Sequence, residues 1–195
     1  MIYHGINWWM MFLIPVLWVL QNLIHELSHA MVLARHGWDY KIYPFYHWYN
    51  FDTAETKYCL SRPEEAGRWK WYFARIDKVH TAEAENLSTS DWAVVDVMPR
   101  VTNTVLFLLC AVLYITVPQN GHFHTFLMMF AFFNSVDAVA GWLPIFCWWN
   151  KKELMDIVRF VSRTNLTRRQ AQVIAICWTI TAATVFFLPW ESFFK

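Results

Sequence analysis

The sequence predicts an all-α integral membrane protein with about four transmembrane helices. Its residues are 57% hydrophobic and 19% aromatic but only 16% charged, which is too apolar a composition for a soluble domain of 195 residues. Four apolar stretches approach or exceed the roughly 20 residues that a helix needs to cross a bilayer. They are residues 6–34, 100–118, 123–149 and 171–189. Because no internal repeat interrupts the pattern, we expect one membrane domain over residues 1–195.

The first and third apolar stretches are longer than a bilayer requires, so each should tilt, kink or project beyond it. Pro15 is the expected position of a kink in the first stretch. The short turn at residues 118–121 makes the second and third spans antiparallel neighbours. Residues 1–11 contain no Lys or Arg, so this end lacks the positive region of a secretory signal, and we expect the first span to be retained.

The connection over residues 36–98 should contain structure of its own. Residues 39–50 are rich in aromatic side chains and Ile, which predicts a strand or hairpin arm at the membrane surface, and Pro44 favours an edge position. From Ser61 onward a capping-box spacing is followed by apolar residues at helical intervals up to Val79. This second pattern predicts an amphipathic helix, which either lies in the membrane interface or packs on another part of the protein.

The distribution of positive charge predicts the orientation of the chain. Nine of the 16 basic residues lie in residues 35–100 and six in residues 151–169, whereas the turn at residues 118–125 has none. By the positive-inside rule, we expect the two long connections to face the cytoplasm and both termini to lie outside, in a plasma or inner membrane. The net charge is only +1, which gives no reason to expect a nucleic-acid partner.

A metal-site motif lies within the first apolar stretch. His25-Glu26-Leu27-Ser28-His29 has the H-E-x-x-H spacing, which stacks two imidazoles on one face of a helix so that both can reach one ion. In zinc hydrolases with this spacing the glutamate accepts the proton of the water activated at the metal. The alternative is that these side chains bond to neighbouring helices, but polar groups inside a bilayer are costly and usually functional.

Two histidines leave a catalytic zinc site one protein ligand short. Apart from Glu26, Asp137 is the only acidic residue deep within a predicted span, and small residues around it would allow a close approach to the first span. We therefore predict Asp137 as the third ligand, with helix packing as its alternative role. Asp91 and Asp96 are rival ligands, although Asp96 has the spacing to pair with Arg100.

These features together resemble the site-2 protease family of intramembrane zinc metalloproteases. The resemblance covers residues 25–30, Pro99 and residues 134–141. It implies that His25, His29 and Asp137 bind zinc and that Glu26 activates water. In that family the later motif places prolines and a Leu-Asp-Gly run around the metal aspartate, whereas Asp137 lies between Val and Ala.

The resemblance also implies how a substrate would be held. The family has a surface strand that binds an unwound substrate segment, and the aromatic arm with Tyr43 and Phe45 is the candidate for it. Asn134 is a candidate donor or acceptor for the substrate backbone. The expected activity is hydrolysis of a peptide bond in a membrane protein or peptide near the cytoplasmic face.

Two other functions are compatible with the sequence. One is a catalytically inactive membrane subunit or pseudoprotease in which the polar cluster serves assembly. The other is a membrane iron oxygenase, because His25 and His29 also read as H-x-x-x-H. Metal content distinguishes all three.

Overall fold

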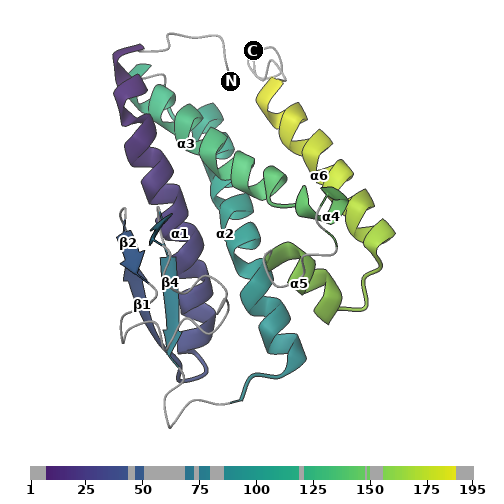
Figure 1. Ribbon diagram of the computed structural model, residues 1–195. Helices are drawn as coiled ribbons and strands as arrows, with labels where there is room; N and C mark the ends of the chain where they lie inside the picture. The colour runs from purple at the N-terminus through teal and green to yellow at the C-terminus, as the bar shows by residue number, and fades with distance from the viewer. Residues whose placement is uncertain are drawn as a thin grey trace.

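The computed structural model confirms an all-helical architecture with four long apolar helices that are able to span a membrane (Figure 1). It describes residues 8–43, 47–50, 69–72, 75–79, 86–118, 121–147, 149 and 156–187. Large apolar side chains on all four helices face outward, including Val16, Leu109, Phe132 and Ile180. An apolar exterior of this kind is stable against lipid rather than water. The chain is therefore an integral membrane protein.

The first span consists of a 3-10 segment, Trp8–Leu13, followed by α1, Ile14–Ala34. Pro15 lies in the first turn of α1, where its missing N–H needs no partner, so it marks a change of helix type and not a kink within α1. Gly37 ends the helix with a φ of 74°, a conformation that other residues rarely adopt. Its N–H donates to the Ala34 carbonyl, and the chain turns directly into the first strand.

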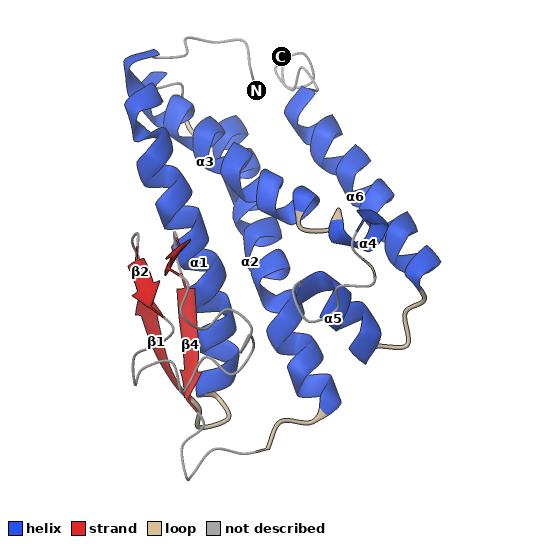
Figure 2. Ribbon diagram, viewed as in Figure 1, coloured by secondary structure: helices blue, strands red, loops and turns tan. Residues whose placement is uncertain are grey.

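The described residues include four short strands, of which β1 and β4 lie beside α1 (Figure 2). β1, Asp39–Tyr43, pairs antiparallel with β4, Arg75–Val79, and β2, His47–Asn50, pairs antiparallel with β3, Trp69–Tyr72. The predicted strand arm is confirmed at residues 39–43 and 47–50. In the sheet that contains β1, the described residues supply one partner strand, so β1 has the expected edge position.

The amphipathic helix predicted up to Val79 is wrong where the structure describes it. Residues 69–72 and 75–79 are the strands β3 and β4. Aromatic and β-branched residues such as Trp69, Trp71 and Ile76 have strand propensity, and pairing with the arm adds backbone hydrogen bonds that an isolated surface helix lacks. The earlier part of the predicted helix, and Phe45, lie outside the described residues.

The second span is α2, Thr89–Thr116, and it begins eleven residues before the predicted start at residue 100. A capping box starts it: the Ser88 hydroxyl accepts from the Asp91 N–H at 3.2 Å, and the Asp91 carboxylate accepts from the Ser88 N–H at 3.1 Å. This cap gives Asp91, a rival ligand in the sequence analysis, a structural role. The polar first turns extend α2 beyond the apolar core of the span.

The remaining helices are α3, Gly121–Ala140; α4, Pro144–Cys147; α5, Asp156–Arg163; and α6, Arg168–Phe187. The third apolar stretch is therefore not one helix to residue 149. A turn over residues 141–143 separates α3 from α4, because Gly141 weakens the helix and Pro144 has no N–H to continue it. The short helix α5 is not among the predicted elements.

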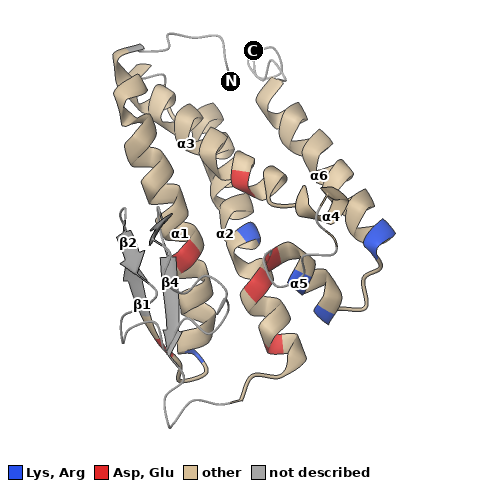
Figure 3. Cartoon of the chain, viewed as in Figure 1, with Lys and Arg blue, Asp and Glu red and all other residues tan. Residues whose placement is uncertain are grey.

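The helices alternate in direction, so the start of α1 and the end of α6 share one end of the bundle, and the strands lie toward the other (Figure 1). In the described helices, charged residues gather in the half of the bundle near α5 and the strands (Figure 3). This relative arrangement agrees with the predicted topology, in which both long connections share a side.

Ion pairs from Asp96 link α2 to α5. The Asp96 side chain is only 1% exposed; one oxygen accepts from Arg159 Nε at 3.0 Å and the other from Arg163. Asp96 thus pairs with α5, while Arg100, its predicted partner, turns toward the α1 histidines. The Arg163 guanidinium also lies over the Trp92 ring, 5.4 Å from its centroid. Ile157, Val158 and Val161 pack beneath these pairs, in the same cluster as Ile145 of α4.

We expect Asp96→Asn to lower the free energy of unfolding by about 3 kcal/mol, because two guanidiniums would lose their anionic partner. Thermal unfolding in detergent measures the loss. Asp91→Asn makes the same chemical change at the exposed cap of the same helix and should lower the stability by about 1 kcal/mol or less. Equal melting temperatures for the two variants would contradict the role of Asp96.

Candidate metal centre

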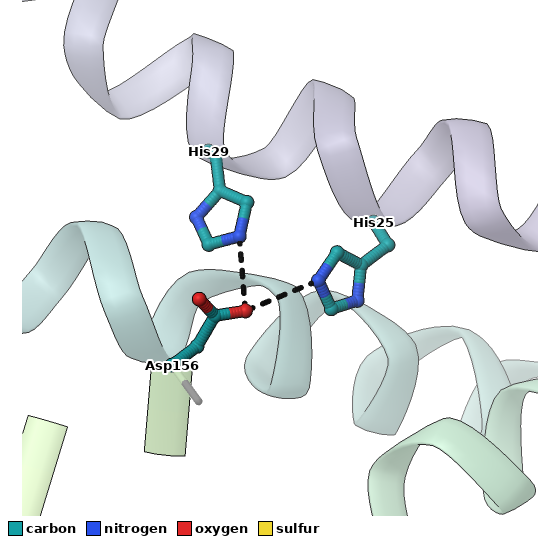
Figure 4. A group of neighbouring side chains, drawn as sticks. All are labelled: His25, His29 and Asp156. Atoms are coloured by element: carbon teal, nitrogen blue, oxygen red, sulfur yellow. Dashed lines mark ion pairs between the residues drawn. The ribbon is translucent and has the colours of Figure 1, made fainter. Parts of the chain in front are cut away.

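The two motif histidines and Asp156 face one another (Figure 4). The Nε2 atoms of His25 and His29 each lie 3.4 Å from the same oxygen, Oδ2 of Asp156. The imidazoles come from successive turns of α1, with ring centroids 5.2 Å apart, and the carboxylate comes from the first residue of α5. These three residues form a group whose ligand atoms all lie within 4.8 Å of one another.

The two imidazole-to-carboxylate spacings match the coordination geometry of zinc, while the full set of ligand atoms lies within 4.8 Å. A tetrahedral ion bound at roughly 2.0 to 2.1 Å places neighbouring ligand atoms about 3.3 to 3.4 Å apart. Both imidazole-to-carboxylate distances in the centre are 3.4 Å. Two imidazole nitrogens and one carboxylate oxygen are also a ligand set that catalytic zinc sites use, with the fourth position left to water. The residues present therefore fit the ion that the motif implies.

The outward-facing nitrogens of the same two rings are held by acceptors. His25 Nδ1 lies 3.2 Å from Asp137 Oδ2, and His29 Nδ1 lies 2.7 Å from the Val95 carbonyl oxygen. Metal-binding histidines characteristically donate this second N–H to a carboxylate or a backbone carbonyl, which fixes the tautomer and the ring orientation. Both Nε2 lone pairs are consequently directed at the space beside Asp156.

Pro99 explains why the Val95 carbonyl is available. In a regular helix this carbonyl would accept from the N–H four residues later, and that residue is Pro99, which has no N–H. The carbonyl instead accepts from His29. The proline in the interior of α2 therefore supplies a hydrogen-bond acceptor at the depth of the second histidine.

Asp137, the predicted third ligand, lies next to His25 but at the nitrogen that faces away from Asp156. It also accepts from Asn103 of α2 and from Arg100 Nη1 at 3.4 Å. The arrangement favours Asp156 as the third ligand and gives Asp137 the task of orienting His25. Arg100 Nη1 is 3.2 Å from His25 Nδ1, but a guanidinium only donates, so Asp137 is the acceptor for a protonated Nδ1.

Gly141 makes room for Arg100. A Cβ at this position would lie 2.0 Å from Arg100 Nε and 2.6 Å from its Cζ, which is closer than any side chain tolerates. Arg100 is 11% exposed, and its Nε finds no hydrogen-bond partner among the described residues. The absence of a side chain at Gly141 thus allows the cation to approach Asp137.

Asp156 is an ionised ligand candidate. Burial alone would raise the pKa of its carboxyl, but the neighbouring His25 and His29 imidazoles and the charge of Arg159 hold that pKa well below its usual range. Its position in the first turn of α5 also stabilises a negative charge.

The sequence prediction missed Asp156 because the search was confined to acids deep within apolar spans, and this residue follows a basic segment. No local spacing in the sequence links Asp156 to His25 and His29, so no pattern along the chain marked it.

The other predicted site residues are placed as follows. Glu26 follows His25 on α1 and is partly exposed. Asn134 is fully buried on α3; its amide donates to the Phe130 carbonyl at 2.7 Å, and its Oδ1 has no donor among the described residues. Tyr43 is the last residue of β1, opposite Arg75, and Phe45 lies outside the described residues.

No family model, curated protein or solved structure matches this chain.

We expect Pro99→Ala to separate stability from metal binding. The new N–H would compete with His29 for the Val95 carbonyl, so zinc affinity should fall about 10- to 100-fold. The helix should become more stable, because an interior proline costs about 3 kcal/mol relative to alanine. Chelator competition and thermal unfolding measure the two effects.

Pro15→Ala provides the control for this substitution, because Pro15 lies in the first turn of α1 and frees no carbonyl near the histidines. Its zinc affinity should equal that of the wild type. Unchanged zinc affinity in Pro99→Ala would show that His29 does not depend on the Val95 carbonyl.

Proposed function

We propose that this protein is an intramembrane zinc metallopeptidase that cleaves a peptide bond of a membrane-protein substrate near the cytoplasmic face. One observation carries the proposal: both motif histidines direct Nε2 at a single carboxylate oxygen while both Nδ1 atoms are held by acceptors. Metal-binding histidines characteristically combine one nitrogen directed at the ion with the other held by an acceptor. The resemblance of the motif to site-2 proteases supports the same reading.

The residues have distinct roles in this reaction. A bound zinc supplies a Lewis acid that polarises the substrate carbonyl and lowers the pKa of a coordinated water. His25, His29 and Asp156 hold it, and Asp137 and the Val95 carbonyl align the two imidazoles. Glu26, adjacent to His25 on α1, accepts the proton from the water and returns it to the leaving amine.

The strands provide a place for the substrate. A transmembrane helix hides its carbonyls in internal hydrogen bonds, so the segment to be cut must become extended before attack. β1 packs beside α1, the helix that carries the motif, and it has one partner strand among the described residues. Addition of the substrate to this edge would hold it extended. Tyr43 and Phe45 remain proposed substrate contacts, whereas Asn134 is fully buried on α3 and would contact a substrate only after a rearrangement.

By the positive-inside rule, the basic connections favour a cytoplasmic position for the charged half of the bundle. The metal centre, α5 and the strands would all lie there. This orientation fits a cleavage near that face of a plasma or inner membrane.

A second candidate follows from the ligand set. Two histidines and one carboxylate with open positions also bind Fe(II) in non-haem oxygenases.

The third candidate, an inactive subunit, predicts assembly without metal. Metal analysis of the purified protein distinguishes them: zinc favours the peptidase, iron with oxygen-dependent turnover favours the oxygenase, and no metal favours the subunit.

We expect His25→Ala and Asp156→Ala each to lose the bound zinc, and Glu26→Gln to keep it but to lose cleavage. Zinc content is measured by mass spectrometry after purification in detergent. Cleavage is measured on synthetic single-span segments in ¹⁸O water, where hydrolysis labels the new carboxylate. His122→Ala, a histidine far along the chain from the centre, should keep both zinc and activity. Full cleavage by Glu26→Gln would remove its assigned role.

Asp137→Asn distinguishes the two aspartates. If Asp137 orients His25, its amide variant should weaken zinc binding about 10- to 100-fold but still bind one ion. Asp156→Asn should weaken it much further, since it removes a ligand. Titration with a chromogenic chelator measures both. The reverse order of affinities would make Asp137 the third ligand, as the sequence predicted.

A further inference from the structure

The two oxygens of Asp156 have different partners. Oδ2 faces the Nε2 atoms of His25 and His29 at 3.4 Å each. Oδ1 accepts a hydrogen bond from the Arg159 guanidinium, one turn later on α5. One oxygen thus points at the candidate metal position, while a cation covers the other.

Arg159 is itself held in place. Its Nε donates to Asp96 Oδ1 at 3.0 Å, and Asp96 is 1% exposed. If the Arg159 guanidinium rotated away from Asp156, the buried carboxylate of Asp96 would lose one of its two cationic partners. Such a loss is strongly unfavourable. The planar fork of arginine can donate to two carboxylates at once. Arg159 therefore bridges Asp96 of α2 and Asp156 of α5.

We propose that Arg159 keeps Asp156 a one-oxygen ligand and thereby reserves a coordination position for water. An aspartate can bind a metal through one oxygen or through both. With Oδ1 bonded to a guanidinium, a second bond to the ion would require that hydrogen bond to break. The proposal rests on the metal centre described above and makes Arg159 a positioning residue.

Cobalt(II) gives the test a spectroscopic signature. Four-coordinate Co²⁺ absorbs visible light strongly, and a fifth ligand weakens that absorption. We expect the Co²⁺-loaded wild type to show the intense four-coordinate spectrum. Arg159→Met, which preserves length but removes the donors, should lose intensity as Oδ1 joins the ion, and peptide cleavage should fall with it.

Arg163→Met is the matched control. Arg163 lies on the same helix and pairs with the same Asp96, but its recorded bonds are to Asp96 and the Trp92 carbonyl. Its loss should lower the melting temperature and leave the cobalt spectrum unchanged. Arg159→Lys, which can still donate to Oδ1, should restore part of the four-coordinate intensity.

Zinc-edge X-ray absorption of the wild type gives a test that does not depend on the folding of a variant. We expect four ligands, with one oxygen from the carboxylate; chelation by both oxygens would overturn the proposal. An unchanged cobalt spectrum in Arg159→Met, or an equal change in Arg163→Met, would also overturn it while leaving the metal centre intact. A wild type that binds neither Co²⁺ nor zinc would overturn the metal centre and this proposal together.

Discussion

Charged side chains among apolar helices must find partners, because neither lipid nor hydrocarbon side chains can solvate them. In this protein, carboxylates pair with guanidinium groups. The carboxylates are those of Asp96, Asp137 and Asp156, and the guanidiniums are those of Arg100, Arg159 and Arg163. Three carboxylates thus face three guanidiniums, and these six side chains carry no net charge. The pairs link α2, α3 and α5 and fix the groups around the α1 histidines. Only one of the Asp156 oxygens remains directed at the imidazoles.

Much of the architecture could be predicted from composition and spacing. The four apolar stretches identify the spanning helices, and the aromatic run after α1 identifies a strand arm, since both depend on local patterns. The boundaries depend on particular residues. Ser88 and Asp91 extend α2 backward through polar turns, and Gly141 with Pro144 divides the third stretch. The strands β3 and β4 depend on pairing across the connection, which a helical periodicity within one segment does not reveal.

The residues of the candidate centre also differ in whether a local sequence pattern could reveal them. His25 and His29 could be found because their relation is local, four residues along one helix. Asp156 could not be chosen over Asp137 by depth, because its place is set by a different helix that lies outside the spans. Asp137 lies beside His25, and its predicted role as a metal ligand stays a prediction. Which nitrogen of the His25 ring it faces depends on ring rotation, and the contacts from Asn103 and Arg100 around Asp137 are not visible in any sequence spacing.

The separation of the ligands between a bilayer helix and a short peripheral helix has a thermodynamic consequence. α1 carries two donors and α5 carries the third, so an ion that binds all three must also bind α5 to the bundle. Binding of the ion and packing of α5 against the bundle are then coupled. Each stabilises the other by the same free energy. Removal of such an ion would therefore loosen α5, which carries Asp156, and a partner bound to α5 would change how firmly the ion is held.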